Sequence, residues 1–394
     1  MSAISEVRGT AKVSIWNDPK NRSIFFQVIL VAVLLFLLWE IVQNTAANLQ
    51  RLNKDLGFAF LSKTAGFDVI QTLVPYSSAS NYGRALYVGF LNTVLVSALG
   101  IVGATLIGFF MGIMRLSKNW LASRIAAVYI DLFRNIPPLL QIFIWYKFVI
   151  QFLPDQKVAP NPFGLFFISN RGMMLPSPVF SDGAWLGLAG LLAAIVAAYL
   201  VRRWARIRQA ATGQPFPVLL TSLALIIVLP ILGLAIAGFP LSWDIPQRTV
   251  FNFRGGYTVI PELIAMFLAL SIYTGTFIAE SVRAGVQAVS HGQTEASHAL
   301  GLRNASTLRL VVVPQAMRVV IPPLASTYLS LTKNSSLAVA IGYPDLVATG
   351  GTVLNQTGKA IEIVSIWMAV YLSLSLLTSL FMNWFNARMK LVER

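Results

Sequence analysis

A short polar segment, EASHALGLRNASTLRLVVVP at residues 295–314, interrupts a chain that is mostly apolar. Its carboxylate, Glu295, and its imidazole, His298, are groups of the type that transfer protons in enzymes. The other groups that such chemistry requires are missing, because the chain has only one further histidine, His291, and no cysteine. Two histidines are too few for a histidine metal cluster, and cysteine-ligated metals and disulfides are excluded. We therefore expect neither catalytic residues nor a bound metal.

Sequence motifs for nucleotide hydrolysis and other common catalysis are absent as well. There is no G-x-x-x-x-G-K-[ST], so the chain itself has no loop to cradle the phosphates of ATP. Neither a G-x-S-x-G elbow nor an H-E-x-x-H helix occurs, and no pair of carboxylates at membrane depth suits acid–base chemistry. The prediction is a protein that is not an enzyme and binds no cofactor of its own.

The polar segment has the features of a helix, a tight turn and a second helix. QTEASHAL has the composition of a short helix, with Gly292 before it and Gly301 after it. Glycine suits the left-handed conformation that ends many helices, because it has no Cβ to clash. Asn304 or Ser306 is expected to cap the helix that follows. Such a segment offers a short rigid helix to a partner.

The elements that hold this segment are expected to be membrane spans. The chain has 394 residues, of which 56% are hydrophobic and 11% charged, whereas soluble domains devote about a quarter of their residues to charge. Each span needs roughly 20 residues. An all-α, polytopic membrane fold of about eight spans is predicted, at 24–43, 86–114, 125–150, 184–201, 217–238, 259–282, 308–332 and 362–387.

Basic residues set the expected orientation. The net charge is +15, but the bases are scattered at the ends of apolar runs, which favours membrane anchoring over nucleic-acid binding. If the amino terminus is cytoplasmic, 17 Lys and Arg lie on the cytoplasmic side and 10 on the other. Both termini and the polar segment are therefore expected in the cytoplasm. The first apolar run is expected to be an uncleaved anchor and not a signal peptide, because Trp39 and Glu40 interrupt its end.

Within the polar segment, Glu295-Ala296 is followed by Gly301 six residues after the glutamate, by the aliphatic Val311 and by Pro314. This pattern resembles the EAA loop of permease subunits of bacterial ABC importers, although Ser297 stands where that family has a second alanine. In that family the short helix docks on a separate ATP-hydrolysing subunit. The resemblance implies a coupling loop at about 285–314, and the alternative is a simple turn back into the membrane. The implied coupling residues are Glu295, Ala296, Ser297, Gly301, Leu302, Arg303 and Pro314.

Other regions are similar to the core of polar amino-acid permeases. They include FRNIPPLLQ at 133–141, LSIYTGTFIAESVRAGVQAVSHGQTEA at 270–296 and TYLSLTKNSSLAVAIGYPDL at 327–346. The first span and an insertion have no counterpart in short members. This arrangement resembles the longer permease subunit of general L-amino acid or glutamate/glutamine/aspartate/asparagine importers, and it implies a type I ABC importer permease fold. The expected parts are 1–82 with the first span, the first core part 83–150, the insertion 151–258, and the second core part 259–394.

Connections on the outer side are expected to be ordered loops or short surface helices. The two longest, 44–85 and 151–183, contain Pro, Gly, Asn and Ser and are too short for a sizeable core of their own. No separate soluble domain is therefore predicted.

Polar residues at membrane depth are candidates for a substrate path, because each is costly unless it faces a partner or water. Asp131 and Arg134 can pair on one helix face, either to fix the kink at Pro137-Pro138 or to contact a ligand. Hydroxyls of the sixth span either bind substrate or hold helices together. The polar cluster that follows the seventh span interrupts an apolar run, where a discontinuous helix exposes backbone groups. The candidates are Arg134, Gln141, Ser271, Tyr273, Thr274, Thr276, Glu280, Lys333, Asn334 and Ser335.

Asn334 stands where many relatives that transport cationic amino acids have aspartate. A neutral amide in place of a fixed charge relaxes charge selection. The resemblance therefore implies a broad or neutral-to-acidic range of L-amino acids.

The resemblance also implies the partners and the location. They are two copies of an ABC ATPase, which hold ATP and Mg, a periplasmic amino-acid-binding protein, membrane lipid and a second homologous permease. A heterodimer is expected and a homodimer is left open, and the location is the bacterial inner membrane. Two rival hypotheses are an ion-coupled secondary amino acid transporter and a channel or structural subunit. The first would have repeated halves, and no convincing inverted repeat is found.

Overall fold

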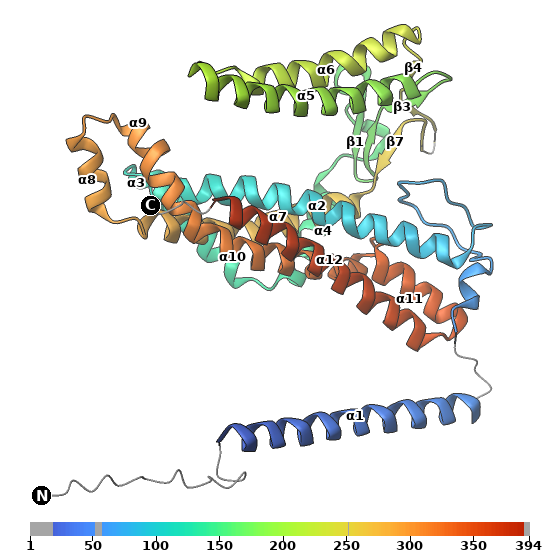
Figure 1. The fold of residues 1–394 in the computed structure, drawn as a ribbon. Helices are drawn as coiled ribbons and strands as arrows, with labels where there is room; N and C mark the ends of the chain where they lie inside the picture. The colour runs from blue at the N-terminus through green and yellow to red at the C-terminus, as the bar shows by residue number, and fades with distance from the viewer. Residues whose placement is uncertain (1–18, 52–56, 251, 390–394) are drawn as a thin grey trace, which may run out of the picture. The chain divides into compact units, whose positions relative to one another are not determined.

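The computed structural model of the protein describes residues 19–51, 57–250 and 252–389. Contacts divide the chain into two units, residues 1–60 and 61–394. The first unit contains α1 (Pro19–Arg51), whose apolar side chains are exposed along its length. The helices of the second unit (Figure 1) are α2 (Tyr82–Arg115), α3 (Trp120–Asn135), α4 (Pro138–Phe152), α5 (Trp185–Thr212), α6 (Val218–Ile236), α7 (Pro261–Gln287), α8 (His291–Ala299), α9 (Asn304–Thr307), α10 (Val313–Asn334), α11 (Leu346–Thr357) and α12 (Ala360–Met389).

Seven of the described helices are long and apolar enough to cross a membrane. They account for seven of the eight predicted spans. These helices confirm the prediction of a mostly helical protein with several membrane spans. Their bounds are Asn21–Asn48, Tyr82–Arg115, Trp185–Thr212, Val218–Ile236, Pro261–Gln287, Asn304–Ile341 and Ala360–Arg388.

The predicted third span, 125–150, is wrong as a single helix, because α3 ends at Asn135 and a separate helix, α4, begins at Pro138. A residue that precedes a proline is pushed out of the helical region, and Ile136, before Pro137, has φ −93° and ψ 124°. The buried side-chain amide of Gln141 lies at the break and donates to the carbonyls of Phe133 at 2.7 Å and Ile136 at 3.0 Å. Pro137 has no N–H for the carbonyl of Phe133, and the extended Ile136 leaves its own carbonyl outside both helices, so this amide satisfies two carbonyls that the break frees.

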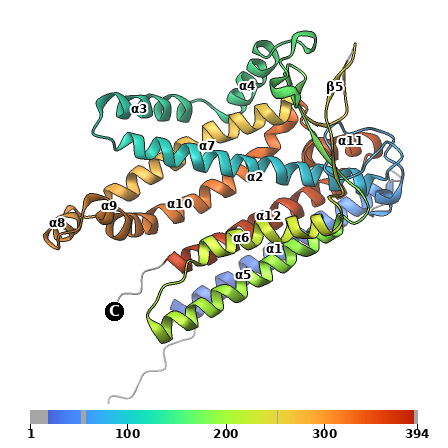
Figure 2. The same cartoon turned by 90° about the horizontal axis from the view of Figure 1, so that it is seen from above.

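α2 and α7 pack closely at the centre of the second unit. Gly100, Ala104, Gly108 and Gly112 recur every four residues along α2 and are buried. A Cβ on Gly108 would lie 2.5 Å from the Cβ of Ile278 on α7, so the backbones approach too closely for a side chain there. Small residues at this spacing allow close helix packing in a bilayer. α10 packs against α7, and α12 packs against α10 (Figure 2).

The insertion contains a helical hairpin and short strands. α5 and α6 pack side by side (Figure 1), and a Cβ on Gly190 would lie 2.4 Å from the Leu229 carbonyl oxygen. The expectation of only loops and short helices in 151–183 is wrong, because this stretch pairs with residues 241–259 into antiparallel ladders. The strands are β1 (Phe167–Ser169), β2 (Gly172–Leu175), β3 (Ser177–Phe180), β4 (Leu241–Asp244), β5 (Gln247–Arg248), β6 (Phe253–Arg254) and β7 (Tyr257–Val259).

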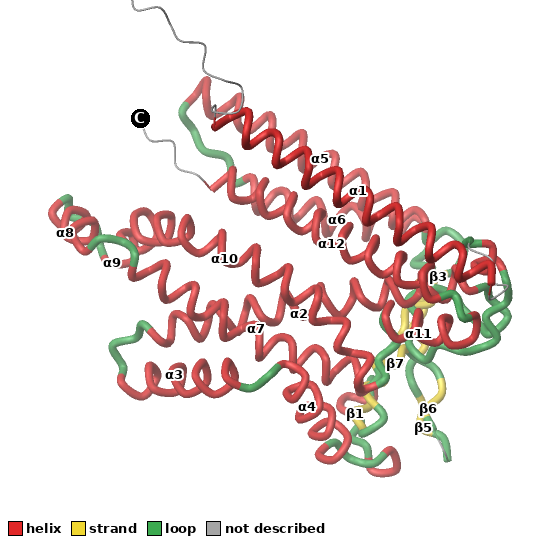
Figure 3. Tube along the Cα trace, turned by 90° about the horizontal axis from the view of Figure 1, so that it is seen from below, coloured by secondary structure: helices red, strands yellow, loops and turns green. Residues whose placement is uncertain are grey.

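The strands form three small sheets with orders β1-β2-β7, β3-β4 and β5-β6. Figure 3 shows them at the end of the second unit opposite α8. The partners in the β2-β7 and β3-β4 pairs are separated in sequence by the whole α5–α6 hairpin. Local sequence patterns therefore do not reveal these two pairings.

Candidate functional site

The polar segment forms α8, which follows α7 at one end of the second unit (Figure 1). The predicted short helix is confirmed, but it begins before Gly292, which lies inside it. The predicted cap of the next helix is wrong. The turn places Arg303, with φ −71° and ψ 154°, at the cap position of α9, ahead of Asn304 and Ser306, and its side chain makes no capping bond.

The turn after α8 is built on Gly301. This residue has φ +76°, in the left-handed region. The N–H groups of Gly301 and Leu302 donate to the carbonyls of His298 and Ser297 at 2.9 and 3.1 Å. These are the two hydrogen bonds of a Schellman motif, which closes a helix end with a left-handed residue. The predicted glycine turn is confirmed.

Two side-chain hydrogen bonds tie α8 to the helix beyond the turn. The hydroxyl oxygens of Ser297 and Thr307 lie 3.0 Å apart, and each residue is only 3% exposed. The amide of Gln315 donates to the Oε1 of Gln293 at 3.3 Å. Ser297, which stands in place of an alanine of the resembled family, thus has a specific partner. The bonds hold helix, turn and following helix together as one piece.

The opposite face of α8 is exposed. The Glu295 side chain is 71% exposed, and its Oε1 lies 3.0 Å from the Nδ1 of His291 one turn earlier. Ala296 and Arg303 are also exposed, and Leu300 is 82% exposed. The surface therefore combines an anion, a cation and an uncovered apolar side chain, which suits contact with another protein.

A wide helical turn separates α9 from α10. Leu308–Val312 is a π-helix, and Pro314 follows it while remaining half-buried. In a regular α-helix the proline ring would clash with the carbonyl of Leu310, four residues earlier. The π turn relieves this conflict, and π segments inside α-helices occur frequently at functional sites.

A polar pocket of about 390 Å³ lies between α7 and α10. Three of the predicted path residues, Tyr273, Thr274 and Asn334, come together in it. The other lining residues were not predicted from the sequence, although Ser326, Ser330 and Asn334 recur every four residues on one helix face, a signal that was available. The full lining is Tyr273, Thr274, Phe277, Ser326, Thr327, Ser330, Leu331 and Asn334.

Other path candidates lie outside this lining. Ser271 is buried against α2, since a Cβ on Gly103 would meet its hydroxyl oxygen. Thr276 donates to the carbonyl of Tyr273 at 2.7 Å, and Ser335 donates to that of Thr332 at 2.7 Å. Lys333 is exposed, and Gln141 lies at the α3–α4 break. The hydroxyls of Thr276 and Ser335 thus bond the backbone three residues earlier and do not face the pocket.

Arg134 contacts the pocket wall and not its neighbour on α3. Its guanidinium carbon lies 5.3 Å from the ring centre of Phe277 on α7, a cation–π geometry. The predicted pairing with Asp131 is wrong, since the two form no ion pair in the described structure. Glu280 does pair with Arg283, whose Nε donates to Oε2 at 3.0 Å.

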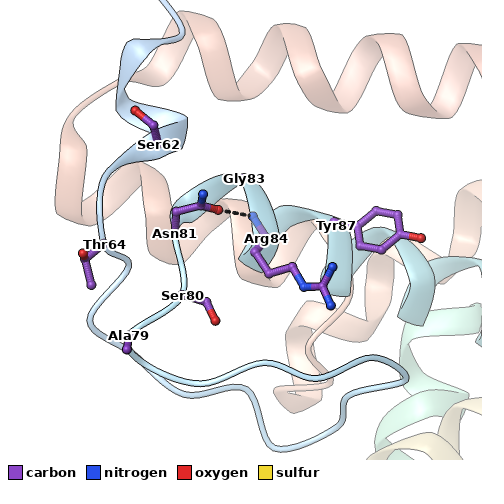
Figure 4. Close-up of a pocket in the computed structure, with 8 residues that line it drawn as sticks. All are labelled: Ser62, Thr64, Ala79, Ser80, Asn81, Gly83, Arg84 and Tyr87. Carbon is purple, nitrogen blue, oxygen red and sulfur yellow. Dashed lines mark hydrogen bonds between the residues drawn. The ribbon is translucent and has the colours of Figure 1, made fainter.

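A second polar pocket, of about 670 Å³, lies where the chain enters α2 (Figure 4). The Oδ1 of Asn81 accepts from the N–H of Arg84 at 2.8 Å and caps α2. The Arg84 guanidinium donates to the carbonyl of Pro75 at 3.0 and 3.2 Å. Both polar groups are therefore engaged in the local fold. The lining is Ser62, Thr64, Ala79, Ser80, Asn81, Gly83, Arg84 and Tyr87.

Asp345 is a buried carboxylate that was not predicted from the sequence. It caps α11, because its Oδ1 accepts from the N–H of Ala348 at 2.8 Å. Burial raises the pKa of Asp345 to about 7, against a lowering by backbone N–H groups of Ala348 and Val347. Its position directly before an apolar helix is an N-cap signal. This carboxyl titrates near neutral pH.

The chain is similar to known transport proteins, to individual relatives along nearly its whole length. Residues 250–391 match the family described as binding-protein-dependent transport system inner membrane component. General L-amino acid transport system permease protein AapQ of Rhizobium johnstonii is 55% identical over 378 residues, covering 96% of this chain and 94% of the relative. Putative amino-acid ABC transporter permease protein YhdX of Escherichia coli is 49% identical, covering 99% and 100%. Glutamate/glutamine/aspartate/asparagine transport system permease protein BztB of Rhodobacter capsulatus is 42% identical, covering 96% of each.

Proposed function

Because this chain belongs to the permease subunits of amino acid ABC transporters, we propose that α8 is the surface on which a separate ATPase subunit drives it. The chain is a multi-pass inner-membrane subunit of an ATP-driven amino acid importer and is not itself an enzyme. Such permeases work with ATPase subunits and with other permease subunits. Ion-coupled secondary transport, the rival hypothesis, does not apply to a member of this family.

The observation that supports the coupling role is the combination of rigidity and exposure in α8. The Schellman turn at Gly301 and the Ser297–Thr307 hydrogen bond fix the helix on one side. Glu295, Ala296 and Leu300 are exposed on the other. A surface that must transmit force needs both properties, since a loosely held helix would move without moving the spans behind it.

Site-specific crosslinking tests the docking surface, because the chain has no cysteine. Ala296→Cys in the purified complete importer, treated with a short reagent that joins thiols to amines, is expected to crosslink to the ATPase subunit. Asn161→Cys is the matched control, because it is also exposed but lies between α4 and β1, in the insertion and not next to α8 in the sequence. Crosslinking that is equal at both positions, or absent at position 296, contradicts the proposal.

We further propose that the pocket between α7 and α10 forms part of the amino acid path. Its hydroxyls and the amide of Asn334 offer neutral hydrogen-bonding groups to an ammonium and a carboxylate. Among the charged residues that the structure describes, Arg134 contacts a residue of the lining, over the ring of Phe277. A pocket with neutral walls and a cation behind one of them favours neutral and acidic amino acids over cationic ones.

Asn334→Asp tests the role of this pocket in charge selection. The added carboxylate is expected to shift uptake towards arginine and away from glutamate. Ser336→Asp is the matched control, because it places the same charge two residues away, outside the lining. If the ratio of arginine to glutamate uptake is unchanged in Asn334→Asp, or shifts equally in the control, Asn334 has no role in charge selection.

The remaining assembly follows from family membership as a proposal. Two ATPase copies bind ATP and Mg, and the hydrolysis of ATP supplies the energy. A second homologous permease completes the path as a heterodimer, and a periplasmic binding protein delivers the amino acid. Both termini are cytoplasmic, and the permease core consists of 83–150 and 259–394 around the insertion 151–258. The subunit ratio of the purified complex, together with protease access to tags on both termini in sealed vesicles, tests these points.

A further inference from the structure

Four arginines surround one pocket at the ends of two helices. The pocket has a volume of about 360 Å³. None of the four guanidiniums has an ion-pair partner in the described part of the chain. The sequence has no acidic residue from 183 to 243 or from 363 to 392, so α5 and the described part of α12 after Glu362 supply no carboxylate to the pocket. The lining is Tyr199, Arg202, Arg203, Arg206 and Ile207 from α5, and Arg388 from α12.

The pocket lies where both helices change from apolar to basic. On α5 the apolar run ends at Val201, and on α12 it ends at Ala387. A tryptophan lies next to an arginine at this boundary on each helix. On α5 the guanidinium carbon of Arg208 lies 5.3 Å from the ring centre of Trp204, and on α12 the guanidinium carbon of Arg388 lies 4.4 Å from the ring centre of Trp384. Tryptophan and arginine at the end of a span mark the headgroup level of a bilayer. The pocket is therefore at that level.

Apolar side chains lead from the pocket along both helices. Leu192, Ile195 and Val196 on α5 are each more than half exposed. Leu377 and Leu380 on α12 are exposed to a similar degree. A ligand with a compact anion at one end and a long apolar portion at the other matches this arrangement.

We propose that this pocket binds the headgroup of an anionic phospholipid, with the phosphate between the arginines of α5 and Arg388 of α12. Guanidinium groups donate paired hydrogen bonds to phosphate oxygens, and basic pockets between spans suit anionic headgroups. The repulsion among four clustered cations is relieved by such an anion. An acidic protein segment would match the charge but would leave the apolar flanks uncovered. The site is separate from the proposed coupling surface and pocket, and it requires only that the chain spans a membrane.

Lipid binding to the complete importer, purified in detergent and stripped of native lipid, tests the proposal. The probe is fluorescent phosphatidylglycerol, compared with fluorescent phosphatidylcholine and with inorganic phosphate as competitor. The wild type is expected to bind phosphatidylglycerol more tightly than phosphatidylcholine. Each arginine replaced by glutamine is expected to weaken phosphatidylglycerol binding about fivefold, tested with Arg202→Gln, Arg206→Gln and Arg388→Gln singly and together.

Arg208→Gln is the matched control, because Arg208 lies on the same end of α5 but does not line the pocket. It is expected to leave binding within about twofold of the wild type. Arg388→Gln, a change of one exposed side chain in the last turn of α12, keeps the test valid if the multiple variant misfolds. Equal affinity for both lipids, or equal weakening in Arg208→Gln, overturns the proposal. Complete displacement by millimolar inorganic phosphate would assign the pocket to free phosphate and also overturn it.

Discussion

Replacing Gly301 by valine is expected to uncouple ATP hydrolysis from uptake while the protein still inserts in the membrane. At φ +76° a residue with a side chain adopts a left-handed conformation, which costs roughly 1–2 kcal/mol. Beyond the two adjoining residues, nothing lies within 4 Å of the position that a Cβ would take, so a Cβ there meets no steric clash that adds to this cost. The whole penalty therefore falls on the turn. A penalty of about 2 kcal/mol lowers the population of the native turn about thirtyfold relative to alternatives.

The assay is the ratio of ATP hydrolysed to amino acid imported, measured with the complete importer in proteoliposomes. Gly301→Val is expected to raise this ratio, because hydrolysis continues on the partner while the loosened α8 transmits less motion. The ratio for Gly301→Asn is expected to lie between those of the wild type and Gly301→Val, since asparagine tolerates the left-handed region better than other residues with side chains.

Gly292→Ala is the matched control for this substitution, because Gly292 lies inside α8 and has no positive φ. Alanine at that position favours the helix and should leave the ratio unchanged. A wild-type ratio in Gly301→Val, or an increase in Gly292→Ala as large as in Gly301→Val, would refute the reasoning from turn geometry.

Two further predictions follow from buried polar groups. Ser297→Ala and Thr307→Val are each expected to destabilise α8 by about 1 kcal/mol, with a double variant no worse than the singles, measured by hydrogen exchange of α8 amides; additive losses would show that the two hydroxyls do not interact. Because burial raises the pKa of Asp345 to about 7, its contribution to stability is present at acidic pH and is lost as the pH rises through that value. The melting temperature of the importer should therefore fall as the pH rises from about 4 to about 7, and it should level off above pH 7. Asp345→Asn, which keeps the cap, should remove this dependence; a variant that retains the full pH dependence would exclude Asp345 as its source.

Features set by neighbouring residues were predictable from the sequence. The α8 helix and the turn at Gly301 follow from a glycine that ends a short helical pattern, and the structure contains both. The seven long helices likewise follow from apolar runs long enough for a bilayer. The break at Ile136 was expected only as a kink, because the sequence does not show that Gln141 compensates the carbonyls that the break frees.

Features set by contacts between distant residues were not predictable in this way. Arg134 was expected to pair with Asp131 on its own helix, but Phe277, more than a hundred residues away, provides its contact. The arginine pocket joins α5 of the insertion to the last turn of α12. Which hydroxyls face the pocket between α7 and α10 depends on how these helices are rotated, and residue type alone does not specify that rotation.

The proposed coupling surface and the proposed amino acid path are connected through the same two helices. α7 supplies one wall of the pocket at Phe277 and ends at Gln287, ten residues later, which is about 15 Å of helix. α10 supplies the other wall, and the Ser297–Thr307 bond fastens α8 to the helical segment that leads into it. Between these levels the helices touch directly, since a Cβ on Gly285 would lie 2.3 Å from the Cγ2 of Val320. A force on α8 therefore reaches both walls of the pocket through packed backbone, and no separate moving part is needed to join ATP hydrolysis to a change in the pocket.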